Sequence, residues 1–190
     1  TAVTHSVREA RSLGLRKPAG IVVHTGDWKL DPGPQVGPPT DLDRLAAIGR
    51  EGVLALVCDS TNVMKPGPSQ SEVEVRRSMA ELIGGLKGRI AVTCFASNVA
   101  RVETIALAAQ AAGRTVVLVG RSLRNLDTAA RECGYLSGVL PFMGEQDVNS
   151  IPDDQLLMII TGSQGEPRAA LSRISLAMHP NLSLGAGDTV

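Results

Sequence analysis

Residues 89–122 read RIAVTCFASNVARVETIALAAQAAGRTVVLVGRS, and this stretch decides the fold class. Arg89–Cys94 and Thr115–Val119 are short apolar runs, which are typical of buried strands. Between them, Asn98–Ala112 carries apolar residues at helical spacing, and Gly113 stands where the helix would end. A strand, a helix and a second strand in this order predict parallel strands joined by a helical crossover.

The same alternation continues on both sides of this stretch. It predicts further strands at Gly20–Thr25, Gly52–Cys58 and Leu156–Thr161, and further helices at Asp41–Arg50, Ser69–Leu86, Arg121–Cys133 and Glu166–Met178. The predicted fold class is therefore α/β, with a mostly parallel sheet and helices on both faces.

Two local patterns refine this prediction. Gly52–Cys58 is a continuous apolar run, as expected of a strand covered on both faces. Ser69 and Glu72 form an S-x-x-E capping box at the start of the helix that follows. The loop Asp31–Thr40 is rich in proline and glycine, and we expect a domain boundary there.

Composition excludes several classes of protein. The 190 residues hold 19 basic and 19 acidic side chains, so any polyanion-binding site must be local. No apolar run approaches the roughly 18 residues of a membrane span, and we expect no membrane partner. Four aromatic residues are too few for a nucleic-acid module built on stacked bases. Cys58, Cys94 and Cys133 are expected to be free, buried thiols in a reducing cytosol.

The strand-to-helix turns are the candidate functional positions, because ligands of open α/β sheets bind beyond the carboxyl ends of the strands. Four turns, at 59–62, 95–98, 120–122 and 162–166, carry small polar or charged residues and are expected on one edge. Backbone N–H groups at helix starts bind anions, so the edge could hold a sugar-phosphate backbone. The alternative is that these residues only cap their helices.

Specific residues follow from the turns. The candidate phosphate-binding residues are Ser97, Asn98, Arg101, Gly120, Arg121, Ser122, Gly162, Ser163, Gln164, Gly165 and Glu166. Arg168 could add a further cation. The chain has neither a G-x-G-x-x-G nor a Walker motif, which argues against the standard nucleotide-binding folds.

A histidine and an aspartate near the N-terminus are candidate metal ligands. Asp27 directly follows the first predicted strand, and His5 lies 22 residues earlier. Spacing alone makes this a weak signal, because a zinc site needs three or four protein ligands.

Five strings then occur in order: HTGDWKLDP (24–32), EGVLALVCDSTN (51–62), CFASNVARV (94–102), VGRSL (119–123) and TGSQGEP (161–167). Together they resemble the ribonuclease J family, the β-CASP branch of the metallo-β-lactamase fold. The resemblance implies that residues 1–40 are a partial metallo-β-lactamase domain and that residues 41–190 are a nearly complete β-CASP domain.

The resemblance also implies roles for single residues. His5 matches a zinc ligand, and Asp27 matches the aspartate that bridges two metals. Asp59 matches the catalytic acid of the first β-CASP motif, and the later turns match those lining the RNA channel. The implied cofactor is a pair of zinc ions, with manganese or magnesium as alternatives. The family's remaining metal-binding histidines would lie outside residues 1–190, so we expect this chain by itself to hold no stable metal and to be inactive.

The function implied for the parent is 5′-to-3′ exonucleolytic and endonucleolytic cleavage of RNA in maturation and decay. The expected partners are single-stranded RNA with a 5′ monophosphate and further copies of the chain, as a dimer or tetramer, and the expected location is the cytoplasm. Two alternatives stay open. One is a non-catalytic RNA-binding or oligomerisation scaffold, and the other is a β-CASP factor for 3′-end processing, although DSTN and SQGEP favour ribonuclease J.

Overall fold

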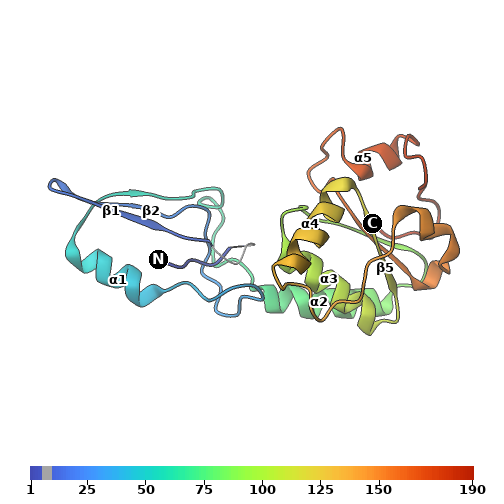
Figure 1. Ribbon diagram of the computed structural model, residues 1–190, viewed down its shortest axis with the longest axis horizontal. Helices are drawn as coiled ribbons and strands as arrows, with labels where there is room; N and C mark the ends of the chain where they lie inside the picture. Colours follow the sequence, from blue (N-terminus) through green and yellow to red (C-terminus); the bar gives the residue numbers. More distant parts are fainter. Residues whose placement is uncertain (6–9) are drawn as a thin grey trace. The chain divides into compact units, whose positions relative to one another are not determined.

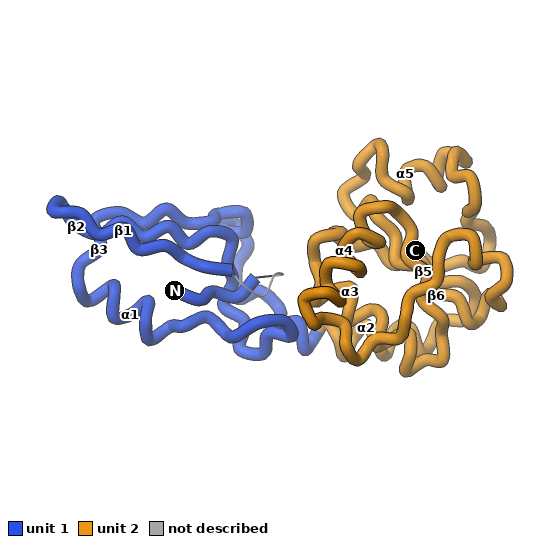
Figure 2. Tube along the Cα trace, viewed as in Figure 1, with its two compact units in different colours: residues 1–74 blue, residues 75–190 orange. Residues whose placement is uncertain are grey.

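The computed structural model describes residues 1–5 and 10–190 (Figure 1). The chain divides into two compact units, Thr1–Glu74 and Val75–Val190 (Figure 2). Each unit has its own three-stranded sheet in the part of the chain that the structure describes. The α/β class is confirmed, but the strand predicted at Gly52–Cys58, which was expected in the sheet of the later strands, belongs to the sheet of the first unit.

The first unit contains β1 (Leu13–Lys17), β2 (Gly20–His24), β3 (Val53–Val57) and α1 (Leu42–Glu51). The strand order is β1-β2-β3, with β1 antiparallel and β3 parallel to β2. Strand β1 was not predicted, because its sequence LGLRK shows no apolar run. A small core of Ile21, Val23 and Ile48 lies between α1 and the sheet.

The second unit is built on β4 (Ile90–Thr93), β5 (Thr115–Val119) and β6 (Leu156–Ile160), all parallel, in the order β4-β6-β5. Its helices are α3 (Val99–Ala111), α4 (Arg121–Glu132) and α5 (Ala170–Ser175), with short 3-10 segments η1 (Glu145–Ser150) and η2 (Asp153–Gln155). Helix α2 (Glu72–Gly85) begins in the first unit and continues into the second.

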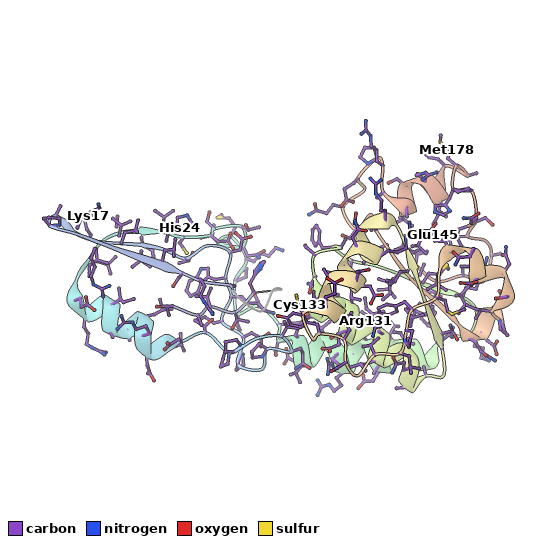
Figure 3. The ribbon with its side chains drawn as sticks, in the orientation of Figure 1. Lys17, His24, Arg131, Cys133, Glu145 and Met178 are labelled. Carbon is purple, nitrogen blue, oxygen red and sulfur yellow. The ribbon has the colours of Figure 1, made fainter. Side chains whose placement is uncertain are left out.

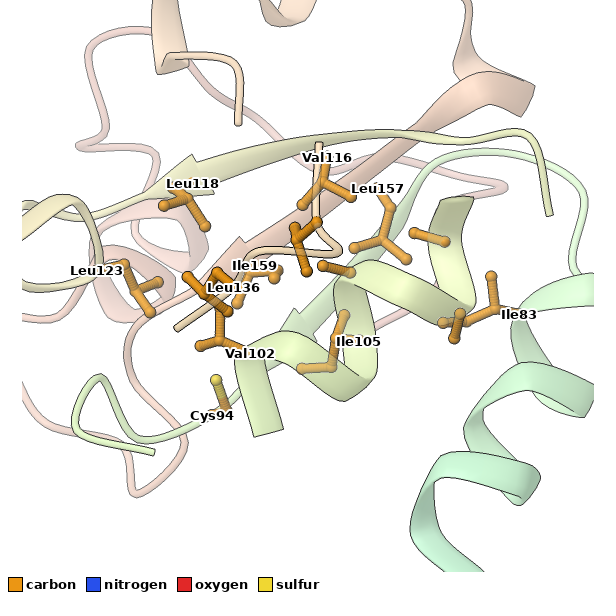
Figure 4. Close-up of a cluster of buried hydrophobic side chains, with 14 of the residues drawn as sticks. Ile83, Cys94, Val102, Ile105, Val116, Leu118, Leu123, Leu136, Leu157 and Ile159 are labelled. Atoms are coloured by element: carbon orange, nitrogen blue, oxygen red, sulfur yellow. The ribbon is translucent and has the colours of Figure 1, made fainter. Parts of the chain in front are cut away.

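Helical segments cover both faces of this second sheet, as predicted. All five residues of the central strand β6 are buried, which explains its continuous apolar sequence. Val102 and Ile105 of α3 pack with Val116 and Leu118 of β5 on one face, together with residues of α2 and α4 (Figure 4). The opposite face packs against η1, α5 and the segment around Leu182.

Strand β3 corrects two predictions. It was expected to be covered on both faces, but all five of its residues are exposed, and it lies at the edge of the first sheet. The turn at 59–62 follows β3 in the first sheet, whereas the other three turns follow strands of the second sheet. The prediction that all four turns share one edge is therefore wrong. The reason is that β3 pairs with β2 and not with β4, β5 or β6.

The boundaries of two helices differ from the sequence prediction. Helix α2 begins at Glu72, and the cap lies at Ser71 in place of the predicted Ser69–Glu72 box: the Ser71 N–H donates to the Glu74 carboxylate at 3.2 Å, and the Ser71 Oγ accepts from the Val73 N–H at 3.3 Å. Helix α5 begins at Ala170, well after Glu166, because residues 162–169 form turns.

The division at 74/75 does not coincide with the predicted boundary near residue 40. Strand β3 follows the Pro/Gly-rich loop and yet pairs with β2, which precedes the loop. The assignment of residues 41–74 to one family domain or the other stays a prediction. In the part of the chain that the structure describes, no helix is long and apolar enough to cross a membrane.

Candidate functional site

A cleft of about 570 Å³ opens at the carboxyl edge of the second sheet. Each of the three parallel strands contributes the residues that directly follow it. The lining consists of Cys94, Phe95, Ala96, Gly120, Arg121, Ser122, Arg124, Glu145, Thr161, Gly162, Glu166, Arg168, Ala169, Ala170, Arg173 and His179. This is the place where open α/β sheets bind ligands.

Two glycines give the cleft its shape. Gly120 has a φ of 115°, and a Cβ there would lie 2.8 Å from the Thr161 Oγ1 atom. Gly162 has a φ of 121°, and a Cβ there would lie 3.0 Å from the Cβ of Ala169. Both positions therefore require glycine, because a side chain would be strained in φ and crowded by the neighbouring turn.

The cleft is locally basic although the chain as a whole is neutral. Its charged residues are Arg121, Arg124, Arg168, Arg173, Glu145 and Glu166, and His179 also lines it. Arg121 and Arg168 are exposed and have no polar partner among the described residues. The cleft thus has four guanidinium groups and only two carboxylates, and two of the guanidinium groups are unpaired. This excess of positive charge suits the cleft to a polyanion.

Glu145 is the most tightly held charge of the cleft. Its Oε1 atom accepts from the backbone N–H of Gly120 at 2.9 Å and from the guanidinium of Arg124. Its Oε2 atom lies 3.6 Å from His179 Nε2. Burial lowers the pKa of His179, the Arg173 charge lowers it further, and the Glu145 carboxylate only partly offsets this.

Among the residues that line the cleft, Cys94 is the one buried side chain that could act as a nucleophile. Burial raises the pKa of the Cys94 thiol to about 11, although the Arg101 charge favours the thiolate. A thiol with so high a pKa is protonated near neutral pH and is a weak nucleophile. The expectation of buried cysteines holds for Cys94 alone, since Cys58 and Cys133 are free and exposed.

The structure brings only some of the predicted phosphate-binding residues to the cleft. Gly120, Arg121, Ser122, Gly162 and Glu166 line it. Six others are not among the lining residues: Ser97, Asn98, Arg101, Ser163, Gln164 and Gly165.

Two of these six have local contacts that explain their polar character. The Asn98 side chain caps α3 by accepting from the Arg101 N–H at 2.9 Å. The Gln164 N–H donates to the Glu166 carboxylate at 3.0 Å within its own turn. At Asn98 and Gln164 the structure thus shows the contacts that a capping or turn-forming role requires.

A second hollow, of about 440 Å³, lies in the first unit and is lined by both His5 and Asp59. The Asp59 carboxylate accepts from the side chain of Thr61 at 2.6 Å and from its N–H at 2.9 Å. These hydrogen bonds, aided by the His5 charge, lower the pKa of Asp59. The carboxylate predicted to be catalytic is therefore ionised at neutral pH.

The predicted metal ligands do not form a complete site among the described residues. Asp27 is exposed and is not among the residues that line the hollow with His5. Nowhere in residues 1–5 and 10–190 do three His, Cys, Asp or Glu side chains gather closely enough to hold a metal ion. Imidazole and carboxylate suit zinc chemically, but two ligands are too few for a stable site.

Sequence reasoning missed Arg124, Glu145, Arg173 and His179. Glu145 enters the cleft from η1, after an irregular segment that follows α4, so no strand-to-helix turn pointed to it. Arg124 lies in the first turn of α4, one position beyond the VGRSL string, and the spacing of Arg121 and Arg124 on one helix face was an available signal.

Comparison with known proteins agrees with the resemblance. A family model described as "Ribonuclease J, beta-CASP domain" matches residues 87–190. The chain is 49% identical over 188 residues to a protein named ribonuclease J from Sinorhizobium meliloti, which covers 99% of the chain. It is 45% identical over 193 residues to one from Mycolicibacterium smegmatis and 39% identical over 188 residues to one from Thermus thermophilus. The chain spans about a third of the length of these relatives.

Proposed function

The chain belongs to the ribonuclease J family through its β-CASP domain, and from this premise we propose that the whole protein is a metal-dependent ribonuclease whose RNA backbone binds in the cleft of the second unit. The proposed activities are 5′-to-3′ exonucleolytic and endonucleolytic cleavage in RNA maturation and decay. Relatives that cover the whole length of this chain carry the name ribonuclease J, which supports the proposal.

The observation that carries the RNA-binding part is the charge of the cleft. Arg121 and Arg168 flank it without polar partners among the described residues. An unpaired guanidinium that already faces solvent loses little when it meets a phosphate, and it releases counterions from the RNA. The chain as a whole has 19 basic and 19 acidic residues, so the excess of guanidinium groups over carboxylates in the cleft is a local one.

The metal-dependent part rests on the first unit. A pair of zinc ions, with manganese or magnesium as alternatives, would supply an activated water and stabilise developing charge. We propose His5 and Asp27 as two of the protein ligands and Asp59 as the ionised acid near them. Because residues 1–5 and 10–190 bring too few ligands together, the site needs others, and we expect this chain alone neither to retain the metal nor to hydrolyse RNA.

The remaining features of the proposal concern partners. We propose single-stranded RNA with a 5′ monophosphate as the preferred substrate and a dimer or tetramer as the assembled state. The cytoplasmic location expected from the sequence stays part of this proposal.

Binding of RNA to arginine variants tests the proposal. The probe is a fluorescein-labelled oligouridylate of about 12 nucleotides, within the usual site sizes, carrying a 5′ monophosphate. The double substitution Arg121→Ala and Arg168→Ala is expected to weaken binding about tenfold. It should also reduce the slope of log K against log salt by about 1.4, since each lost phosphate contact on a single strand changes it by roughly 0.7.

A matched control removes two positive charges elsewhere in the second unit. Arg77 and Lys87 are exposed and do not line the cleft. The double substitution Arg77→Ala and Lys87→Ala should change affinity less than twofold. Equal weakening by both double variants would show that the cleft has no special role, and unchanged binding by both would favour the non-catalytic scaffold.

A further inference from the structure

Glu145 holds a position in the cleft that a ligand's phosphate would also take. Its Oε1 atom accepts from the Gly120 N–H at 2.9 Å, immediately before α4, and from the Arg124 guanidinium. A backbone N–H at a helix start combined with an arginine is the usual pair of donors for a phosphate oxygen. Glu145 belongs to the second unit and is labelled in Figure 3.

The two side chains of this ion pair differ in their exposure to solvent. The Glu145 side chain is 16% exposed, whereas the Arg124 side chain is 51% exposed and lies in the open part of the cleft. Arg124 can therefore reach a ligand, but its charge is already neutralised by the carboxylate. Arg121 and Arg168 beside it have no such counter-charge among the described residues.

The other charged groups around Glu145 do not replace Arg124 as its counter-charge. His179 Nε2 is 3.6 Å from the second carboxylate oxygen, and its side chain is 3% exposed. Burial and the nearby Arg173 keep the pKa of His179 below its usual value, so the imidazole is mainly neutral at pH 7. Glu166, the other carboxylate of the cleft, receives the N–H of Gln164 within its own turn.

We propose that Glu145 is an affinity-determining residue of the cleft, whose carboxylate occupies the phosphate position on Gly120 and Arg124 until bound RNA displaces it. This inference rests on the proposed binding of RNA in the cleft. It adds that the Glu145 carboxylate, an internal anion, holds the cleft in its binding shape and thereby lowers the affinity for RNA. The Glu145 carboxylate thus neutralises Arg124, one of the four arginines that line the cleft.

The substitution Glu145→Gln tests this directly, because glutamine keeps an oxygen that accepts from Gly120 while it removes the charge. Binding of the labelled oligouridylate should become about fivefold tighter, the effect expected of one partly exposed ion pair. The slope of log K against log salt should stay nearly unchanged, because bound RNA contacts Arg124 in both chains, after displacing Glu145 in one and directly in the other. A purely structural role of Glu145 would not make RNA binding tighter.

The control is Glu132→Gln, which removes the same charge from the exposed far end of α4. It should leave both affinity and salt slope unchanged. If Glu132→Gln has the same effect as Glu145→Gln, or if Glu145→Gln binds RNA no more tightly than the unchanged chain, the inference is wrong.

A second variant decides the matter even if Glu145→Gln does not fold. Arg124→Gln should reduce the salt slope of the unchanged chain by about 0.7, since RNA that displaces Glu145 uses Arg124. An unaltered slope would overturn the inference. The failure of the proposed function is distinguishable: in that case the Arg121→Ala and Arg168→Ala double variant also binds RNA as the unchanged chain does.

Discussion

Ser71 Oγ donates to Asp31 Oδ1 over 2.6 Å, although the two residues are 40 positions apart in the sequence. Asp31 also accepts from the backbone N–H groups of Glu72 at 3.1 Å and Gly33 at 2.9 Å, and it forms an ion pair with Lys29. Its side chain is only 1% exposed. The carboxylate of a distant loop thereby caps the first turn of α2 and fixes the loop to the helix.

The first prediction concerns Asp31→Asn. Burial alone would raise the pKa of Asp31, but its hydrogen bonds and Lys29 lower it overall. Because the folded pKa lies below the unfolded value of about 3.9, the carboxylate stabilises the fold above roughly pH 4, and this is lost as pH falls through the folded pKa. Asp31→Asn should reduce the free energy of unfolding by about 2 kcal/mol at pH 7 and flatten its dependence on pH below 4.

Urea denaturation followed by the fluorescence of Trp28, which belongs to the first unit, measures this effect. Asp43→Asn is the control, since Asp43 is an exposed carboxylate in the same unit. It should cost less than about 0.5 kcal/mol. A cost for Asp31→Asn no larger than for Asp43→Asn would remove Asp31 as the helix cap.

The second prediction concerns Arg114, a buried arginine that stabilises the second unit. Its guanidinium donates to the carbonyl oxygens of Leu86 at 2.6 Å, Gly88 at 2.8 Å and Leu156 at 3.2 Å. Arg114→Ala should lower the free energy of unfolding by about 3 kcal/mol, because it leaves these carbonyls without a charged donor. Circular dichroism during urea unfolding measures it, with the exposed Arg121→Ala as a control that changes stability by less than about 0.5 kcal/mol.

The third prediction distinguishes the three thiols. Cys58 and Cys133 are exposed, whereas Cys94 is buried and its pKa is raised to about 11. At pH 8 a disulfide reagent should label Cys58 and Cys133 quickly and Cys94 only after addition of denaturant, since the thiolate is the reactive form. Rapid labelling of three thiols in the folded chain would contradict the burial of Cys94.

The fourth prediction concerns the exposed apolar side chains of the first sheet. Leu54 on β3 is 65% exposed, and Leu13 and Leu15 on β1 are more than half exposed. Since β1 and β3 are both edge strands, we expect this chain to self-associate at high concentration. Leu54→Lys should raise the concentration at which light scattering detects association, without loss of stability.

The control for this variant is Ser78→Lys, which adds the same charge at an exposed position of α2. Equal suppression of association by both substitutions would mean that net charge, and not the apolar edge, governs it. In the central strand of the same sheet, Ile21 and Val23 of β2 are buried against Ile48 of α1, so only the flanking strands expose apolar side chains.

The sequence predicted the second unit well because its local patterns and its packing agree. The run LLMII is apolar throughout and forms the fully buried central strand β6, and Asn98 caps α3 as its position before the helix indicates. It failed at β3, whose run VLALV is equally apolar but lies exposed at a sheet edge. Apolar character alone does not say which strand a strand will pair with.

The candidate site was predictable only where turns directly follow strands. Gly120, Arg121 and Gly162 were found in this way, and all three line the cleft. Glu145 and His179 enter from irregular segments far along the chain, so only tertiary packing brings them there. Asp59 and His5 line the same hollow of the first unit. The sequence alone could not place them there, because the pairing of β2 with β3 is a tertiary feature.

The most direct test of RNA binding in the cleft is a titration of the ¹⁵N-labelled chain with the 5′-phosphorylated oligouridylate, followed by amide chemical shifts. We predict saturable shifts concentrated at Gly120, Arg121, Ser122 and Gly162, with the amides of β1 and β2 unchanged. Shifts confined to the first unit, or spread evenly over both units without saturation, would contradict the assignment of the RNA-binding site to this cleft.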